Sequence, residues 1–435
     1  MFDVLGNRTY RHLFLAQIIA LIGTGLTTVA LGLLAFDLAG AQAGAVLGTA
    51  LAIKMAAYIG VAPVAAAFAE RLPRRAMLVT LDLTRALVAL ALPFVTQVWE
   101  IYLLIFVLQS ASAAFTPTFQ ATIPDILTDE VQYTKALSLA RLAYDMESVV
   151  SPMLAAALLT VISFHSLFAG TSVGFVVSAL LVSSVLLPQA RAAVPRSIYE
   201  RTTRGVRIFL ATPRLRGLLA LNLAVAAASS MVIVNTVVLV QSRFALPQRF
   251  TAMALAAFGA GSMIAALALP GLLKNVSDRV AMLAGVGLLI LGLSAGTQLS
   301  GYGQLLVVWG VLGVGYSLAQ TPGGRLLRRS AHAQDRPALF AAQFALSHVC
   351  WLVTYPLVGW LSANVGLVAS FGAMAVIAVL ALMACVVLWR PSHEQVHVSH
   401  RHDDLPVGHP HLALNHGGVH GHDYVIDDLH RRWPA

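Results

Sequence analysis

Twelve apolar runs, each of roughly 20 residues or more, recur along the chain between short charged or Pro/Gly-rich breaks. At 1.5 Å per residue, a helix of about 20 residues crosses the roughly 30 Å hydrocarbon layer of a bilayer. Only 11% of the residues are charged, whereas a soluble domain carries about a quarter. The sequence therefore predicts an all-α membrane protein. The expected spans are 12–36, 43–69, 76–97, 101–122, 138–162, 165–187, 217–240, 251–273, 280–299, 303–322, 338–361 and 366–389.

The basic residues predict how these spans are oriented. Nineteen Lys and Arg would lie on the side of the N-terminus, and only Arg243 and Arg249 would lie on the other side. Because cytoplasmic connections are enriched in Lys and Arg, both termini are expected in the cytoplasm. This distribution accounts for the net charge of +9 without a nucleic-acid partner. We expect a multi-pass monomer in the lipid bilayer of a bacterial inner membrane.

The longest internal connection divides the spans into two sets of six. We expect an N-terminal half at 1–187, a cytoplasmic linker at 188–216, a C-terminal half at 217–389 and a flexible tail at 390–435. The linker contains a basic amphipathic stretch whose apolar residues, such as Phe209, would anchor it to the inner leaflet. Two six-helix halves are typical of transporters that rock around a central site.

Two connections carry an acid next to arginines, Glu70-Arg71 between the second and third spans and Asp278-Arg279 between the eighth and ninth. The first resembles the loop motif of the major facilitator superfamily, although Pro73 replaces an expected glycine. This resemblance implies a latch whose charges pair across the halves in one conformation and separate in the other. Anchoring by positive charge alone would explain the arginines but not the acid. The implied gate residues are Glu70, Arg71, Arg74, Arg75, Asp278 and Arg279. Asp82 and Arg85, three residues apart near the inner end of the third span, are interpreted more simply as a local ion pair in the same gate region.

A narrower resemblance lies in the stretches 322–330 (PGGRLLRRS) and 340–360 (FAAQFALSHVCWLVTYPLVGW). Both are similar to the nickel-resistance permeases, which are major facilitator exporters with a cytoplasmic histidine-rich tail. The resemblance implies the major facilitator fold, with twelve helices in two halves. It also implies secondary export of a divalent transition metal, nickel first and cobalt or zinc next. The arginine that the superfamily places three residues before Gln109 is absent, because Phe106 stands there, so proton coupling is not carried over from the resemblance. No permanently bound cofactor is expected.

The tail has a composition of its own, with ten of the fourteen histidines of the chain, three pairs of them spaced H-x-H. Neutral imidazole at cytoplasmic pH is a ligand for nickel, zinc, cobalt or copper. Frequent Gly and Pro argue against a packed fold, so we expect a flexible chain that gathers its ligands into an adaptable site. A solvated polar tail without metal is the simpler alternative. The candidate ligands are His393, His397, His400, His402, His409, His411, His416, His420, His422 and His430.

Ionisable residues inside spans are costly and are therefore functional candidates. Lys54 lies near the middle of the second span, and Asp145 and Glu147 lie in the fifth. Side chains two residues apart on a helix differ by about 200° in direction, so Asp145 and Glu147 cannot lie on the same face. Arg141 can neutralise Asp145, which leaves Glu147 as the freer carboxylate for a cation or a proton. Alternatively, Lys54 and a carboxylate form an ion pair that only holds helices together.

Polar side chains in the later spans are further candidates for the transport path. His348 and Tyr355 are seven residues apart and share one face of the eleventh span. Asn222 of the seventh span is a candidate for the wall of a cavity. A lone buried histidine is more often a hydrogen-bonded core residue than a ligand, and intramembrane amides often bond only neighbouring helices.

The sequence contains no G-x-x-x-x-G-K-[ST] phosphate loop and no Ser/His/Asp or H-E-x-x-H set. We therefore expect neither an enzyme nor an ATP-driven pump. The favoured interpretation is a proton-coupled metal exporter that works by alternating access. Two alternatives stay open: an exporter of an organic drug or siderophore with an incidental tail, and a membrane metal-binding or sensing protein that transports nothing.

Overall fold

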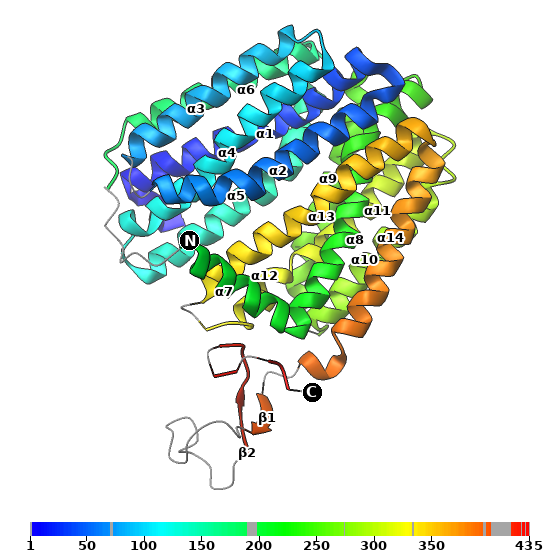
Figure 1. Cartoon of the computed structure of the whole chain (residues 1–435). Coiled ribbons are helices and arrows are strands. Elements are labelled where there is room, and N and C mark those ends of the chain that lie inside the picture. Colours follow the sequence, from blue (N-terminus) through cyan, green and yellow to red (C-terminus); the bar gives the residue numbers. More distant parts are fainter. Residues whose placement is uncertain are drawn as a thin grey trace.

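The computed structural model is almost entirely helical (Figure 1) and describes residues 2–69, 73–188, 198–273, 275–332, 335–394, 397–401, 419–427, 429–430 and 432–434. Within these ranges, twelve long helices coincide with the twelve expected spans, so the prediction of the fold class is confirmed. The N-terminal half contains α1 (Arg8–Ala39), α2 (Ala43–Ala69), α3 (Arg74–Ala91), α4 (Val98–Ile126), α5 (Glu130–Leu158) and α6 (Phe164–Ser183). The C-terminal half contains α8 (Pro213–Val237), α9 (Gln248–Leu272), α10 (Asp278–Gly296), α11 (Tyr302–Gln320), α13 (Arg336–Asn364) and α14 (Leu367–Leu388).

Shorter elements lie at the ends of these helices and between them. The α-helices α7 (Ile198–Ala211) and α12 (Gly323–Arg328) and the strands β1 (His397–Arg401) and β2 (Val419–Asp423) belong to the predicted cytoplasmic side. Short 3-10 helices are η1 (Phe2–Gly6), η2 (Gly40–Gln42), η3 (Leu92–Phe94) and η5 (Pro391–Glu394), and η4 (Val238–Arg243) is a π-helical continuation of α8.

The long helices form because lipid offers the backbone no hydrogen-bond partner, so each span must satisfy its own N–H and C=O groups. Ten described segments are long and apolar enough to cross a membrane, and the first of them, Arg8–Val61, contains both α1 and most of α2. On α14, Val376, Leu380, Met383 and Val387 are exposed at helical spacing, a stripe that lipid covers without cost. The chain is a multi-pass membrane protein.

Each half packs as one bundle (Figure 1). In the first half α1 packs on α5 and α6, α2 on α4, and α3 on α4 and α6; in the second half α8 packs on α13 and α14, and α11 on α9 and α10. The halves meet mainly along two helix pairs, α2 with α13 and α5 with α9. A site that lies between these pairs contacts both halves.

Glycines allow α2 and α13 to approach closely at their outer ends. A Cβ at Gly48 would clash with the carbonyl oxygen of Tyr355, and one at Gly359 would clash with that of Gly44. The Gln42 side chain donates a 3.5 Å hydrogen bond to the carbonyl oxygen of Ala363. The outer ends of α2 and α13 are therefore in direct contact, which we call the outer seal.

The linker helix α7 packs on protein, which corrects the expectation that its apolar residues anchor it to lipid. Ile208 and Phe209 are fully buried in the core of the C-terminal half. Arg204 donates two hydrogen bonds, of 2.6 and 3.0 Å, to the carboxylate of Asp335 at the start of α13. The helix therefore belongs structurally to the C-terminal half.

The described segments of the tail also differ from the expectation of an unpacked chain. Strands β1 and β2 form an antiparallel hairpin, and Tyr424, Val425 and Ile426 after it are buried. Gly and Pro composition is a local signal, whereas this hairpin joins segments that are well separated along the chain, and the buried segment contacts the bundle. The tail lies beyond the same end of the bundle as α7 (Figure 1).

Candidate functional site

Four polar side chains from three helices form what we call the central cluster: Lys54 and Tyr58 on α2, Glu147 on α5 and His348 on α13. Lys54 and Glu147 each lie about 16 Å from the outer end of their helix, and Tyr58 and His348 about 22–24 Å, at 1.5 Å per residue. All of these depths fall inside the hydrocarbon layer, the first two near its middle. The four side chains are half-buried.

Lys54 and Tyr58 tie the cluster together. Lys54 interacts electrostatically with Glu147 and with His348. Its ammonium lies 5.7 Å from the centre of the Tyr58 ring, and that ring lies 5.6 Å from the ring of His348. Among the described residues, no ion pair within 4 Å joins Lys54 to Glu147. The two opposite charges interact without a direct ion pair among the described residues.

The backbone of α1 leaves room for Glu147. A Cβ at Gly25 would clash with the side chain of Ser151 and would lie 3.1 Å from Oε1 of Glu147. A small cavity of about 10 Å³ is lined by Lys54, Gln109 and three threonines of α1, together with four Leu and Ile side chains of α1, α2 and α4. It is large enough for about one water, so Lys54 borders a small recess of mixed polarity inside the N-terminal half.

The ring of His348 is held in one orientation. Its Nδ1 lies 2.6 Å from the backbone oxygen of Phe344, and a carbonyl oxygen only accepts hydrogen bonds. Nδ1 must therefore carry the hydrogen, so Nε2 of the neutral ring keeps its lone pair. Histidines that bind metals are usually oriented by this kind of hydrogen bond from the other ring nitrogen.

Aromatic side chains around His348 were missed at the level of sequence. Phe344 stacks on Tyr58 with ring centres 6.1 Å apart, and Trp351 lies 6.1 Å from the His348 ring. The spacing of Phe344, His348 and Trp351, at i, i+4 and i+7, places all three on one face of α13. That spacing could have identified them, but aromatic residues at helical spacing usually indicate a core.

Other predicted site residues lie elsewhere or are not described. Tyr355 is buried and interacts electrostatically with Tyr316 of α11, and among the described residues no contact joins its side chain to His348. Asn222 is buried in α8 with its Nδ2 unpartnered in the described structure. The side chains of Asp145 and Arg141 lie outside the described residues, and their pairing stays a prediction.

The described gate residues pair within their own halves. Arg74 forms a 2.5 Å ion pair with Asp125 of α4, and Arg75 donates to the backbone of Ser183 on α6. Glu70 and Arg71 lie outside the described residues. Among the described residues, neither Arg74 nor Arg75 has a partner in the other half, and the latch stays a prediction.

Asp278 and Arg279, the corresponding charges of the C-terminal half, also have their described partners in their own half. Asp278 lies 3.6 Å from Arg325 and 3.7 Å from Arg329. Arg279 donates a 2.9 Å hydrogen bond to the backbone oxygen of Trp389. All of these partners belong to the C-terminal half.

Asp82 and Arg85 form a buried ion pair inside the N-terminal half. Ser178 donates to Asp82 at 2.7 Å, and the Arg85 guanidinium lies between the rings of Phe115 and Phe175, 4.1 and 4.5 Å from their centres. The Arg85→Leu variant should lose about 3–5 kcal/mol of stability, because a buried carboxylate is left unpaired. Asp82→Asn combined with Arg85→Leu should recover most of this loss. Thermal unfolding in detergent measures both, and equal losses would contradict the prediction.

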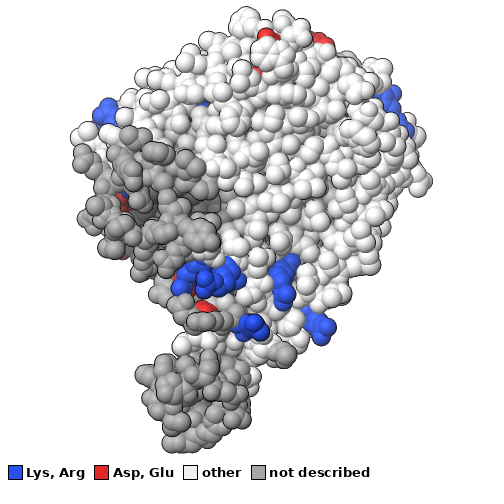
Figure 2. Space-filling model, viewed as in Figure 1, with Lys and Arg blue, Asp and Glu red and all other residues white. Residues whose placement is uncertain are grey.

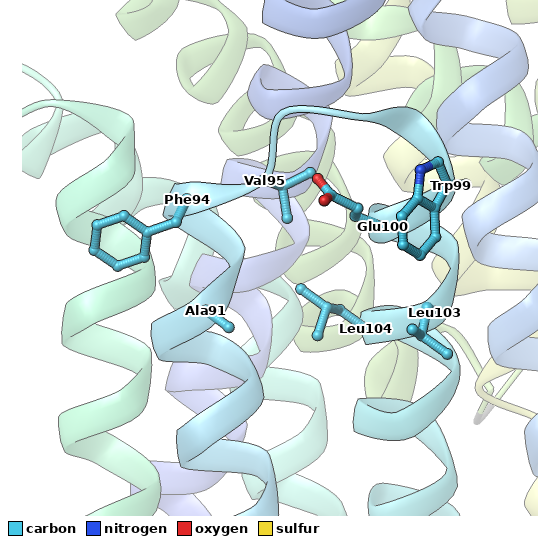
Figure 3. Close-up of a pocket in the computed structure, with 7 residues that line it drawn as sticks. All are labelled: Ala91, Phe94, Val95, Trp99, Glu100, Leu103 and Leu104. Atoms are coloured by element: carbon cyan, nitrogen blue, oxygen red, sulfur yellow. The ribbon is translucent and has the colours of Figure 1, made fainter.

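A larger pocket, of about 270 Å³, lies at the outer end between α3 and α4 (Figure 3). Its lining is apolar except for Glu100, whose carboxylate accepts hydrogen bonds from the backbone at the start of α4. All of its lining residues belong to the N-terminal half. This pocket is therefore separate from the interface at which cargo must pass between the halves.

The tail histidines fall into three groups. His393 and His430 are described, and His397, His400, His420 and His422 occupy positions in the two strands. Burial, with the positive charges of Arg390 and Arg216, lowers the pKa of His393, so its ring stays neutral. The other candidates, His402, His409, His411 and His416, lie outside the described residues.

His430 is part of a packed contact. It is 3% exposed, and its Nδ1 lies 3.0 Å from Oδ1 of Asp427. Burial alone would raise the pKa of Asp427, but hydrogen bonds from the backbone of His430 and Leu429, with the His430 charge, lower it. Oδ2 of Asp427 lies 3.3 Å from Nε2 of His332, so this contact fastens the tail to the loop between α12 and α13.

Basic side chains mark the end of the bundle from which the tail extends. On the visible face, Lys and Arg gather along the rim near α7 (Figure 2). This distribution agrees with the predicted cytoplasmic side.

The family model described as "Major Facilitator Superfamily" matches residues 13–295 and 218–416. The chain is a member of the Major Facilitator Superfamily. It is therefore a membrane transporter and not an enzyme.

An uncharacterized MFS-type transporter of Bacillus subtilis (strain 168), YfiS, is 24% identical over 296 residues, which are 64% of this chain and 69% of YfiS. Macrolide efflux protein A of Streptococcus pyogenes is 26% identical over 153 residues, only 33% of this chain and 38% of that protein.

Solved structures of this superfamily share the fold. A bacterial homologue of the human lysosomal transporter Spinster, in an inward-facing and unoccupied conformation, has a TM-score of 0.70 and 14% identity over 87% of this chain and 96% of its own. The nucleoside transporter NupG has a TM-score of 0.65 and 12% identity over 88% of this chain and 99% of its own. At such identities the likeness extends to the fold alone.

Proposed function

We propose that this major facilitator protein exports a divalent transition metal, nickel first and cobalt or zinc next, in exchange for protons. One observation carries the proposal: Glu147 and His348, from opposite halves, both interact with Lys54 and Tyr58 in one cluster inside the membrane. Carboxylate and imidazole are ligands that these metals accept. A rocking carrier needs such ligands from both halves.

The exchange follows from the protonation chemistry of these ligands. Metal binding requires an ionised carboxylate at Glu147 and a lone pair on Nε2 of His348, so protons compete with the metal. Protons that enter from the outer side displace the metal there, and their release toward the cytoplasm restores the site. Lys54 balances the Glu147 charge while the site holds no cargo.

An exporter of an organic compound is the second candidate. The rings of Tyr58, Phe344 and Trp351 around His348 favour a flat apolar cargo, and one relative is named as a macrolide efflux protein. The sensing alternative has less support, because the chain belongs to a transporter family.

Cells that express the protein should tolerate more nickel and hold less of it. The expected change is lower cellular nickel at equal exposure, measured by elemental analysis against cells that carry the Glu147→Gln variant. Cobalt and zinc are tested in parallel. Unchanged tolerance to all three metals together with resistance to macrolides would support the organic cargo and reject the metal.

Deletion of residues 393–435 should leave transport intact at saturating metal and weaken it at scarce metal. The tail begins after the last helix and so lies outside the path between the halves, but its imidazoles raise the local metal concentration. Capture should also fall as pH drops through about 6.5, because protonated imidazole does not bind metal. Nickel flux in inverted vesicles measures this. Loss of flux at saturating nickel, in a folded truncated protein, would place the tail in the transport path.

A further inference from the structure

The small recess that Lys54 borders contains a buried acceptor without a partner. Oε1 of Gln109 on α4 is buried and has no hydrogen-bond partner in the described structure, and the residue is only 6% exposed. At 1.5 Å per residue, Gln109 lies about 16 Å from the outer end of its helix, the same depth as Lys54. A buried amide oxygen without a partner is costly, so a hydrogen-bond donor is expected to visit this position.

Two threonines of α1 that line the recess add acceptors to it. Thr24 donates its hydroxyl hydrogen to the backbone oxygen of Ala20 at 2.9 Å, and Thr28 donates to that of Thr24 at 3.0 Å. A hydroxyl has one hydrogen and two lone pairs, so both oxygens remain able to accept. With Gln109, the polar part of the lining therefore offers three acceptors, and Leu and Ile side chains form the rest. Such a lining suits a group that only donates.

The ammonium of Lys54 is a group of this kind. It carries three N–H donors and no acceptor, and it is about as large as the single water that the recess can hold. Its flexible four-carbon stem allows the ammonium to change position while the backbone of α2 stays fixed. In the described conformation Lys54 interacts electrostatically with Glu147 and His348. Lys54 therefore borders two sets of partners, one in the central cluster and one in the recess.

A cationic cargo would force a choice between these partners. A divalent cation held by Glu147 and His348 would repel an ammonium that interacts with both, and such repulsion is strong where water is scarce. An ammonium that leaves Glu147 inside hydrocarbon needs other partners. All residues that line the recess belong to the N-terminal half, so movement of Lys54 into it would leave His348 of the other half free for the cargo. A neutral cargo would exert no such repulsion.

We propose that the recess is a second binding position for the Lys54 ammonium, which moves there from the central cluster when a cationic cargo binds Glu147 and His348. Gln109 is then a positioning residue, because its oxygen accepts the ammonium while the cargo occupies the cluster. The proposal rests on the proposed function, and it adds that Lys54 competes with the cargo for Glu147.

The first test uses the redundancy of the two positions and needs no nickel. Glu147→Met removes the acid of the first position, and Gln109→Met removes the acceptor of the second. Each single variant leaves Lys54 one position, whereas the double variant leaves its charge without a partner. The thermal unfolding temperature of the full-length protein in detergent should therefore fall by more than the sum of the two single decreases. Additive decreases would overturn the proposal.

Two controls separate this redundancy from general destabilisation. Lys54→Met, added to the double variant, removes the unpaired charge and should restore most of the unfolding temperature, or the yield of folded protein if the double variant does not fold. Gln17→Met is the matched replacement, because Gln17 of α1 is also 6% exposed with an unpartnered Oε1 but does not line the recess. Its combination with Glu147→Met should be additive. No recovery with Lys54→Met, or an equal excess loss with Gln17→Met, would overturn the proposal.

Nickel flux tests the competition between Lys54 and the cargo. In Gln109→Met the ammonium stays at Glu147, so the nickel concentration for half-maximal flux into inverted vesicles should rise by at least about fivefold, with the maximal flux retained. Gln17→Met should leave this concentration unchanged. An unchanged concentration in Gln109→Met would overturn the proposal. Absence of nickel flux in the unmodified protein would reject the proposed function, whereas the unfolding temperatures would still decide for or against the second position of Lys54.

Discussion

The Glu147→Gln variant should lose nickel flux by about ten- to hundredfold, because a contact with a charged group contributes about 1.5–3 kcal/mol. The amide keeps the volume and polarity of the side chain but neither binds a metal as an anion nor carries a proton. Flux of nickel into inverted vesicles, driven by a pH gradient, measures the loss. Size-exclusion chromatography and thermal unfolding show whether the variant is folded.

Asp145→Asn is the matched control, since the two acids are two residues apart on α5. We expect it to retain most of the flux, because Arg141 lies one turn before Asp145 and can neutralise it. Retained flux in Glu147→Gln with lost flux in Asp145→Asn would show that Asp145 is the working acid. A second control, Glu147→Asp, keeps the charge and should restore part of the flux.

The Gly48→Val variant should lose transport by a different route, by opening the outer seal. A side chain at Gly48 meets the backbone of Tyr355, and such overpacking costs about 1–3 kcal/mol. An energy of this size shifts a two-state equilibrium by about 5–150-fold, here away from the sealed conformation. Turnover should fall accordingly, because the carrier must visit both conformations.

Gly60→Val is the control on the same helix, because a Cβ there meets nothing within 4 Å. The conformational shift is measured by cross-linking Gln42→Cys to Ala363→Cys, with Cys350 and Cys385 replaced by Ser. Cross-linking should decrease with Gly48→Val and stay unchanged with Gly60→Val. Normal cross-linking together with lost transport in Gly48→Val would exclude the seal as the cause.

The membrane fold was predictable because lipid imposes length and polarity on each span separately. Lys54 and Glu147 were identified for the same reason, since a charge in hydrocarbon must have a function or a partner. Their proximity to His348 was not predictable, because it depends on how α2, α5 and α13 cross. Tyr58, Phe344 and Trp351 were missed because aromatic residues are compatible with core, lipid and cavity alike.

The tail was the least predictable part. Its Gly and Pro content indicates an unpacked chain when only neighbouring residues are considered. The pairing of His400 with His420 depends on contacts between segments far apart in sequence. Arg214, at the start of α8, gives no local sign that Trp433 will cover it. The strand pairing and the contact of Trp433 with Arg214 are both tertiary contacts, and amino-acid composition does not predict such contacts.

Because the described part of the tail is attached to one half only, its distance from the other half should change during the transport cycle. Because His332 and Arg214, which contact Asp427 and Trp433, both belong to the C-terminal half, we expect the described segment 424–427 to move with that half. A spin label placed near Leu429 and another on α3 of the N-terminal half would therefore change separation as the carrier rocks. Such a pair would report the motion by pulsed resonance spectroscopy without a probe in the cargo path.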